Sequence, residues 1–298
     1  MASVLESLPR ESRVAILRLR SLGDCVLTTP ALDILRRARP DLRVAIVVEE
    51  RFAEIFAGNP DVDEILPPGL RALRGFRPRL CLNLHGGTRS TWMTALSGAR
   101  WRAGFAHFRA QAVYNVRIPR AQEILGVERK VHTAEHLAGA MFFLGARVME
   151  IPRAKLAAGT KNTPAGRGYA VIHAVAATPA KTWGAAGFVS VAESLLHSGV
   201  EPVFIGAAGD DLSPFAAYRI VQGAPLSQIK TLLSEAAFFV GNDSGPAHMA
   251  AAFGIPVIAI FSASDPIVWA PWRTVSAVLT APQPSEVLDA IARLRVHA

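Results

Sequence analysis

The chain has 298 residues, of which 51% are hydrophobic and 19% are charged, and its formal net charge at pH 7 is +8. This composition predicts a soluble globular protein with room for two core-bearing domains, and no apolar run reaches the roughly 18 residues that a membrane span requires. The two cysteines, Cys25 and Cys81, are too few for a disulfide framework, and the N-terminus has no apolar signal core, so a cytoplasmic location is predicted.

The basic charge predicts a negatively charged partner, such as nucleic acid, an anionic membrane surface or a phosphorylated substrate. The sequence has no nucleic-acid-binding motif and no run of alternating aromatic and basic residues, so phosphate-bearing lipids or sugars are favoured over nucleic acid. It also has no G-x-G-x-x-G after the first predicted strand and no P-loop lysine motif, which disfavours a dehydrogenase or a nucleotide hydrolase.

The first half alternates between predicted strands and helices, an order typical of a parallel α/β sheet. Strands are predicted at residues 13–19, 44–48, 64–66 and 80–84, and helices at residues 26–38, 51–57, 88–97 and 131–144. Asp24 lies in the turn between the first strand and the first helix, where a carboxylate either caps the helix or accepts a proton from a substrate hydroxyl. Cys25 begins that helix, a position that can lower a thiol pKa, but a small buried packing residue is the favoured interpretation.

A polar stretch rich in glycine and proline, GTKNTPAGRG at residues 159–168, predicts a linker between two domains, 1–160 and 161–298. The alternation then restarts. Strands are predicted at residues 169–173, 203–206, 238–240 and 256–261, and helices at residues 186–197, 226–236 and 246–254. Two such α/β halves predict a ligand-binding cleft at the carboxyl ends of their strands.

The turn after residues 238–240 has the features of an anion site. Its sequence, GNDSGPAH, joins a buried strand to the start of a helix, where free backbone N–H groups and the helix dipole attract phosphate. Gly245 allows a ligand to approach closely, while Asp243, Ser244 and His248 supply a carboxylate, a hydroxyl and an imidazole. His248 also fits the role of a structural imidazole within the helix.

Two short patterns resemble metal sites without predicting one. HTAEH at residues 132–136 matches the H-x-x-E-H zinc protease pattern, but no helix further along the chain offers a third ligand. DVD at residues 61–63 resembles a metal-binding D-x-D, but Asn59 and Pro60 before it indicate an ordinary turn. No bound metal and no other cofactor are therefore expected.

Several ordered motifs resemble those of the lipopolysaccharide heptosyltransferase family, glycosyltransferase family nine. They are LRSLGD with TTPAL in residues 19–32, GNPDVD at 58–63, LNLHGG at 82–87, PAKTW at 179–183, and DSGPAH at 243–248 followed by GIPV and SDP. The resemblance implies a GT-B fold, an α/β architecture of two Rossmann-like domains whose parallel sheets face across a cleft. The N-terminal domain would bind the acceptor and the C-terminal domain the nucleotide sugar.

The implied reaction is inverting, metal-independent transfer of heptose from ADP-heptose onto a phosphorylated saccharide or lipopolysaccharide-core-like acceptor. It would take place at the inner face of the membrane, with peripheral contact to the anionic surface and without nucleic acid. A catalytically silent protein that binds a sugar nucleotide or a polyanion is the alternative from another class. A different nucleotide-sugar enzyme, such as an epimerase, is a third option.

The resemblance also implies roles for individual residues. Asp24 matches the base, and Lys181, with Thr178 beside it, matches the loop that neutralises the leaving diphosphate. A lysine in a solvated loop is the simpler alternative for Lys181. Arg20 and Arg51 are candidates for holding the anionic groups of the acceptor, although exposed arginines usually need no such role.

The chain departs from the family at two places. Ala174 and Val175 follow His173 where family members often have Pro-Gly, and a glycine there would let backbone amides wrap an anion. The segment at residues 206–227 is also compact, and Asp210 and Asp211 within it are both candidates for the acidic residue with which the family holds the ribose.

Overall fold

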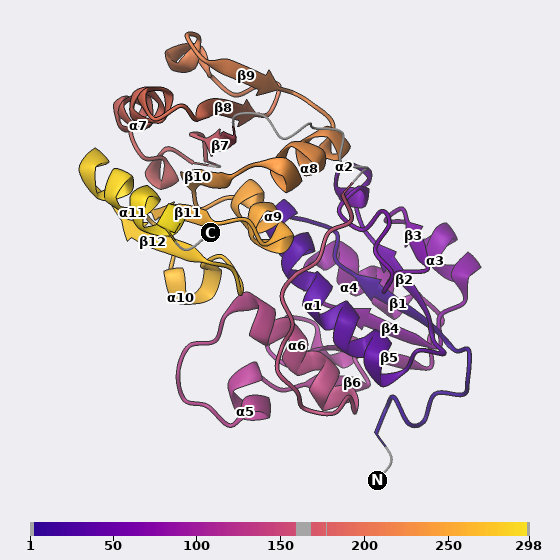
Figure 1. The fold of residues 1–298 in the computed structure, drawn as a ribbon. Coiled ribbons are helices and arrows are strands. Elements are labelled where there is room, and N and C mark those ends of the chain that lie inside the picture. Colours follow the sequence, from indigo (N-terminus) through magenta and orange to yellow (C-terminus); the bar gives the residue numbers. More distant parts are fainter. Residues whose placement is uncertain (1–2, 159–167, 177, 297–298) are drawn as a thin grey trace. The chain divides into compact units, whose positions relative to one another are not determined.

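The computed structural model describes residues 3–158, 168–176 and 178–296, and the chain divides into two compact units, Met1–Ala157 and Ala158–Ala298. Figure 1 shows the elements of each. The predicted linker at residues 159–168 lies outside the described residues apart from Gly168. The acceptor-binding and donor-binding roles of the two halves stay predictions.

The first unit contains a parallel six-stranded sheet in the order β3-β2-β1-β4-β5-β6. Its strands are β1 (Arg13–Leu17), β2 (Arg43–Val47), β3 (Glu64–Leu66), β4 (Leu80–Asn83), β5 (Trp101–Phe105) and β6 (Val116–Ile118). Its helices are α1 (Leu22–Ala38), α2 (Glu50–Ala53), α3 (Leu70–Phe76), α4 (Thr88–Ala95), α5 (Ala121–Leu125) and α6 (Thr133–Leu144), with a 3-10 turn at Gln111–Val113. One buried cluster joins the sheet to α3 and α4 through Leu17, Leu73, Phe76 and Met93.

The second unit repeats this arrangement. Its parallel sheet has the order β12-β11-β10-β7-β8-β9, which places the first strand of the unit between its second and its fourth, as in the first unit. The strands are β7 (Tyr169–His173), β8 (Glu201–Gly206), β9 (Arg219–Gln222), β10 (Phe238–Asn242), β11 (Val257–Phe261) and β12 (Ser276–Thr280). The helices are α7 (Ala185–His197), α8 (Leu226–Glu235), α9 (Gly245–Phe253), α10 (Pro266–Trp269) and α11 (Pro284–Val296), with 3-10 turns at Pro179–Lys181 and Ser213–Phe215.

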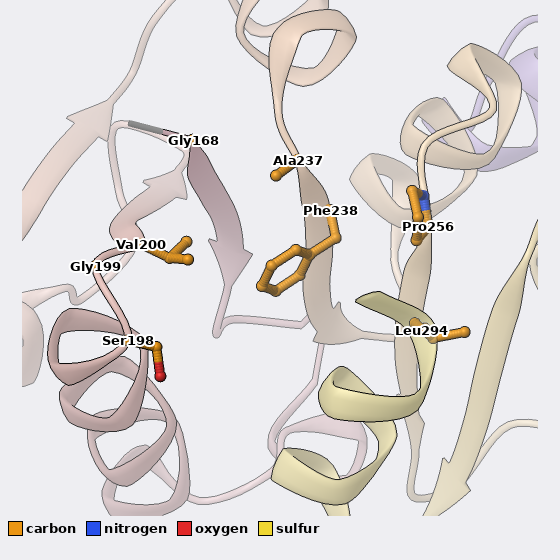
Figure 2. A pocket seen from close by; sticks show the side chains of 8 residues that line it. All are labelled: Gly168, Ser198, Gly199, Val200, Ala237, Phe238, Pro256 and Leu294. Atoms are coloured by element: carbon orange, nitrogen blue, oxygen red, sulfur yellow. The ribbon is translucent and has the colours of Figure 1, made fainter. Parts of the chain in front are cut away.

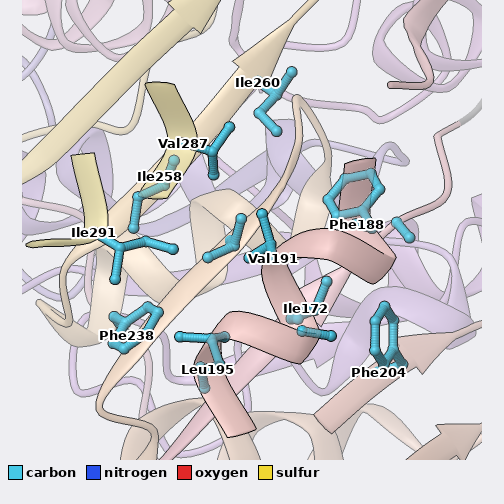
Figure 3. Packing of buried hydrophobic residues seen from close by; sticks show 14 of the residues in the cluster. Ile172, Phe188, Val191, Leu195, Phe204, Phe238, Ile258, Ile260, Val287 and Ile291 are labelled. Atoms are coloured by element: carbon cyan, nitrogen blue, oxygen red, sulfur yellow. The ribbon is translucent and has the colours of Figure 1, made fainter. Parts of the chain in front are cut away.

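One buried cluster of the second unit lies between its sheet and two helices, α7 and α11. Val191 and Leu195 of α7 and Ile291 of α11 pack with side chains of β7, β8, β10 and β11, among them Ile172 and Phe204 (Figure 3). The central strands β7, β8, β10 and β11 are apolar along most of their length because a parallel sheet with helices on its faces is buried on both sides.

Each predicted strand and helix has a counterpart, but some boundaries were wrong. Helix α1 begins at Leu22 rather than at residue 26, and α2 is shorter than the predicted helix at residues 51–57. Four strands, β5, β6, β9 and β12, and four helices, α3, α5, α10 and α11, were not predicted from the sequence. Residues of β9 and β12 remain partly exposed because these are edge strands, and β5 contains Gly104, against which the Tyr114 ring packs too closely for any side chain.

Candidate active site

In each sheet, the first and fourth strands of the unit lie side by side, and the connections that follow them lead to opposite edges of the sheet. Such a pair of strands marks a topological switch point. Ligands of doubly wound sheets bind at the carboxyl ends of such a strand pair. In the first unit the pair is β1 and β4, and Asp24 and Arg20 follow β1. In the second unit the pair is β7 and β10. Lys181 and Thr178 follow β7, whereas the turn from Asp243 to Gly245 follows β10.

Asp24 is the third residue of α1 and not the residue before it, which corrects the simple capping interpretation. The helix is capped by Ser21, whose hydroxyl donates to Asp24 Oδ2 at 2.9 Å and whose backbone N–H approaches the same oxygen at 3.4 Å. The second carboxylate oxygen, Oδ1, accepts from Arg18 Nη1 at 3.2 Å. The side chain stays 24% exposed, so the carboxylate is oriented by protein groups and still reachable from solvent.

Arg18, which the sequence analysis did not single out as a site residue, is the cation that faces Asp24. Only 6% of Arg18 is exposed, and its Nε makes no hydrogen bond with the described residues. Burial lowers the pKa of the guanidinium, and the Asp24 carboxylate opposes that shift. Burial also raises the pKa of Cys25, next to Asp24, to about 12, so Cys25 is a packing residue and not a reactive thiol.

Asn83, at the end of β4, shapes the turn opposite Asp24. It is fully buried, and its Oδ1 accepts from the backbone N–H groups of His85 and Gly86 at 3.0 and 3.1 Å, while its Nδ2 donates to the Tyr114 hydroxyl at 2.8 Å. Burial lowers the pKa of the half-buried His85 imidazole, and the positive charges of Arg18 and Arg20 lower it further. A neutral imidazole therefore stands near the Arg18–Asp24 pair.

The side chains of the H-x-x-E-H match have structural contacts. His132 caps α6 by accepting from the Ala134 N–H at 3.0 Å, Glu135 pairs with Arg129, and the His136 ring stacks on Phe105 with centroids 4.0 Å apart.

The D-x-D match is likewise part of ion pairs. Asp61 lies 2.7 Å from Lys155 Nζ, and Asp63 lies 2.7 Å from Arg36 Nη2. Among the described residues, no group of three or more His, Cys, Asp or Glu side chains is arranged to hold a metal ion.

In the second unit, polar groups gather around the buried Asp243 carboxylate. Its Oδ2 accepts from the Ser264 hydroxyl at 2.5 Å and lies 3.5 Å from Lys181 Nζ, while Oδ1 is 3.9 Å from His248 Nε2. Lys181 keeps 36% of its side chain exposed, whereas only 4% of the His248 side chain is exposed. The fold therefore brings Lys181 and the predicted anion turn together, although they are 62 residues apart in sequence.

Asn242 fixes the loop that carries Lys181, a role that was not predicted from the sequence. The side chain is fully buried; its Oδ1 accepts from the Trp183 backbone N–H at 2.9 Å, and its Nδ2 donates to the Ala174 carbonyl at 2.9 Å. Asn242 ends β10 as Asn83 ends β4, so the same residue type occupies the same place in both units. The sequence signal that could have indicated this role is an asparagine at the end of an apolar strand.

The turn after β10 leads into the N-terminus of α9. Ser244 is the residue before this nine-residue helix, and its buried hydroxyl oxygen has no hydrogen-bond partner among the described residues. Gly245 begins the helix and is followed by Pro246, which has no N–H, so the N–H groups of Gly245 and Ala247 are the ones unpaired within the helix at the positive end of the dipole. Thr178 is exposed, and its carbonyl accepts from the Lys181 N–H at 3.0 Å.

The ribose candidates lie beyond β8 and are held by their own loop. Asp210 accepts from the Ala207 N–H at 2.7 Å, and Asp211 accepts from the N–H and hydroxyl of Ser213 at 3.0 and 2.6 Å. Burial lowers the pKa of His173, at the end of β7, to about 4, and Asp210 opposes that shift, so Asp210 is the candidate nearer to the β7–β10 switch point.

The two predicted acceptor arginines differ in their surroundings. Arg20 is exposed and close enough to His85 to influence its pKa. Arg51 is exposed in α2, pairs with Glu49 at 2.8 Å and lies over the Phe52 ring. The structure places Arg20 beside the Asp24 site, whereas Arg51 follows β2.

A cavity of about 270 Å³ lies at the opposite end of the second sheet. Its walls include Gly168, Ala237 and Pro256, which precede β7, β10 and β11 (Figure 2). These are the amino ends of the strands, so the cavity is separate from Lys181 and Asp243. Within the described parts of the chain, no helix combines the length and apolar character that a membrane crossing requires.

The chain is similar in sequence to known heptosyltransferases. The family model described as glycosyltransferase family 9 (heptosyltransferase) matches residues 70–288. Lipopolysaccharide heptosyltransferase 3 of Escherichia coli is 26% identical over 304 residues, which cover 85% of this chain and 84% of that protein.

Two solved structures share the fold. The family 9 glycosyl transferase from Veillonella parvula superimposes with a TM-score of 0.86 at 19% identity, over 97% of this chain and 98% of that one. E. coli heptosyltransferase WaaC with ADP-2-deoxy-2-fluoro heptose gives a TM-score of 0.76 at 22% identity, over 94% and 99%. The expected GT-B class, with two parallel α/β sheets, is confirmed. The chain belongs to glycosyltransferase family 9, the heptosyltransferase family.

Proposed function

We propose that this glycosyltransferase moves heptose from ADP-heptose onto a phosphorylated saccharide or lipopolysaccharide-core-like acceptor, with inversion at the anomeric carbon and without a bound metal. The observation that carries the proposal is the grouping of Lys181 with the Asp243–Gly245 turn at the N-terminus of α9, at the switch point of the second sheet. This is an anion site built from parts that the chain brings together over a long sequence separation.

On the donor side, the ammonium of Lys181 and the free N–H groups of α9 offer positive charge to a diphosphate. Asp243 orients the lysine, and the Ser244 hydroxyl, which has no partner in the described part of the chain, offers a hydrogen bond to a phosphate or sugar oxygen. Lysine and helix dipole together can balance the charge that develops on the leaving ADP, which supports a reaction that needs no divalent cation. The ligand of the WaaC structure, an ADP-heptose analogue, supports ADP-heptose as the donor.

On the acceptor side, Asp24 is the proposed general base. Its carboxylate takes the proton of an acceptor hydroxyl while the hydroxyl oxygen forms a bond to the anomeric carbon, and the bond from that carbon to the diphosphate oxygen breaks with its electron pair leaving on ADP. Attack from the face opposite the leaving group inverts the anomeric centre. Arg18 keeps the carboxylate oriented through the 3.2 Å contact, and Arg20 offers charge to an anionic acceptor.

The acceptor and the location follow from charge. A net charge of +8 suits a phosphorylated acceptor and an anionic surface, and we propose that the enzyme works in the cytoplasm with peripheral contact to the inner face of the membrane. Arg51 is a weaker candidate for the acceptor contact because it is already paired with Glu49.

The test is turnover of ADP-heptose with a panel of phosphorylated core saccharides, followed by mass spectrometry and by NMR of the new glycosidic bond. We expect a product one heptose heavier whose anomeric configuration is opposite to that of the donor. Donor binding that raises the melting temperature without turnover on any acceptor would favour the silent binding protein. A changed sugar that is still attached to its nucleotide would favour the epimerase.

A further inference from the structure

The positive charge of the chain is concentrated in one segment of the first unit. Residues 65–122 contain ten arginines and no aspartate or glutamate, so this segment carries more than the whole net charge of +8. The acidic residue that precedes it, Glu64, faces Arg43 at 3.6 Å. The segment includes α3 and α4, which pack on one face of the sheet through Leu73, Phe76 and Met93.

Hydrogen bonds from two arginines join the α3 and α4 segments on the side away from this core. Arg74 of α3 donates to the carbonyl of Leu96 at 2.7 Å, and Arg89 of α4 donates to the carbonyl of Pro68 just before α3. Both arginines are exposed, as is Arg71 one turn before Arg74. The outer side of this helix pair is therefore a surface with several guanidinium groups.

On the same side, α4 reverses the usual pattern of a surface helix, in which apolar residues are buried and polar residues face solvent. The buried positions of α4 include Ser90 and Thr94, whose hydroxyls bond to helix carbonyls, while Trp92 is 63% exposed and Leu96 is 41% exposed. The other four tryptophans are at least partly buried. Arg89, Trp92 and Leu96 are spaced by three and four residues, so they follow one stripe of the helix.

We infer that the surface formed by Arg71, Arg74, Arg89, Trp92 and Leu96 docks the first unit onto an anionic lipid bilayer. Tryptophan is favoured at the boundary between headgroups and acyl chains, a neighbouring leucine adds apolar area, and arginines attract anionic headgroups. Nucleic acid fits less well because stacking proteins use several aromatic side chains along a groove, whereas this surface offers one indole on the outside of a helix.

The position of this surface relates it to the candidate active site. Helix α4 begins at Thr88, directly after the His85–Gly87 turn at the carboxyl end of β4. A bilayer bound to the outer side of α4 would lie near the turn that faces Asp24 within the same unit. The inference rests on the proposed function for its biological purpose, which is access to a lipid-linked acceptor, but the binding itself requires neither donor nor acceptor.

Cosedimentation of the full chain with vesicles that contain phosphatidylglycerol and phosphatidylcholine, and no glycolipid, tests the inference. We expect binding that weakens as salt is raised and is absent with phosphatidylcholine alone, because exposed charges are screened beyond about 10 Å at 0.1 M salt. The pair Trp92→Ala and Leu96→Ala should weaken binding about tenfold or more. The pair Arg71→Gln and Arg89→Gln should weaken it about twenty-fivefold, at roughly fivefold per charge.

A control for the leucine and arginine changes uses two exposed positions of the second unit, Leu196→Ala on α7 and Arg293→Gln on α11. This control should bind vesicles as the unchanged chain does. A second readout is a blue shift of tryptophan emission on vesicle addition, which Trp92→Phe should remove. Equal melting temperatures show that each variant is folded.

The inference is overturned if the unchanged chain does not sediment with anionic vesicles at low salt, if the control pair loses as much binding as the docking variants, or if binding requires an acceptor glycolipid in the vesicles. The last result would make the surface an acceptor subsite. Turnover of a water-soluble acceptor gives a separate measurement, because loss of that activity refutes the proposed function and leaves vesicle binding unaffected.

Discussion

Replacement of Asp24 by asparagine tests the proposed base most directly. The substitution keeps the size of the side chain and one oxygen that can accept from Ser21, but it removes the basicity and the negative charge that faces Arg18. General bases typically contribute about 10²-fold to 10⁴-fold to rate, so transfer should fall by that factor. Donor affinity should hardly change, because ADP is expected to bind in the second unit.

The same substitution should also cost stability. Asp24 makes one hydrogen bond to a charged group, a contact typically worth about 1.5 to 3 kcal/mol, and its 24% exposure reduces this through solvent screening. We expect a loss of about 1 to 2 kcal/mol in the free energy of unfolding, seen as a melting temperature about 2–8 °C lower. Activity is therefore measured well below the melting transition of the variant.

The control is Ser21→Ala, which removes the hydroxyl that bonds to Asp24 Oδ2 and leaves the carboxylate in place. It should cost about 1 kcal/mol of stability, as a lost N-cap does, and should keep turnover within about threefold of the unchanged enzyme. Steady-state transfer from ADP-heptose is the assay for both variants. If Asp24→Asn keeps more than about a third of the turnover, or if Ser21→Ala loses as much as it does, the role of Asp24 is structural.

Four further predictions follow from the described contacts. Lys181→Ala should reduce transfer by about 10²-fold to 10³-fold, as loss of one preorganised donor does, and unchanged steady-state turnover would mean that Lys181 is an ordinary loop residue. Protein dialysed against a chelator should keep full transfer activity, a result contradicted by stoichiometric zinc in elemental analysis or by activity that returns with a divalent ion. Asn242→Leu should lower the unfolding free energy by about 2 kcal/mol or more, because it leaves the Trp183 N–H without its acceptor. Calorimetry should also show weaker binding of ADP to this variant. An unchanged ADP affinity would refute the role of Asn242 in fixing the Lys181 loop. Burial is the main cause that lowers the pKa of His136 to about 4, so the unfolded chain binds more protons between pH 6.5 and 4 and stability falls as the pH falls through this range. At pH 5 this histidine alone should cost about 2 kcal/mol of unfolding free energy, beside a similar cost from His173, whose pKa is also lowered to about 4. In urea unfolding, His136→Phe should therefore reduce the loss between pH 6.5 and pH 5 by about 2 kcal/mol, and an unchanged pH dependence would contradict this.

Local sequence signals were sufficient wherever a residue's role depends on its immediate neighbours. Alternation of apolar strands with helices predicted the α/β class, and the GNDSGPAH turn predicted a helix N-terminus after a buried strand. The turn at residues 58–63 was predicted to be ordinary, and its aspartates do form structural ion pairs. Edge strands such as β9 and β12 were missed because one side of an edge strand is open, so its sequence need not be uniformly apolar.

The sequence by itself determined which chemical groups stand at the ends of the strands, because strand, turn and helix propensities act over a few residues. Only the tertiary structure decided which of those groups meet. Arg18 faces Asp24 because α1 begins one turn earlier than its apolar pattern indicates, and Lys181 reaches Asp243 because parallel pairing of β7 with β10 brings their carboxyl ends to one edge. Asn83 and Asn242 gained part of their roles in the same way, since a buried amide must find partners, and Tyr114 for Asn83 and Ala174 and Trp183 for Asn242 come from segments distant in sequence.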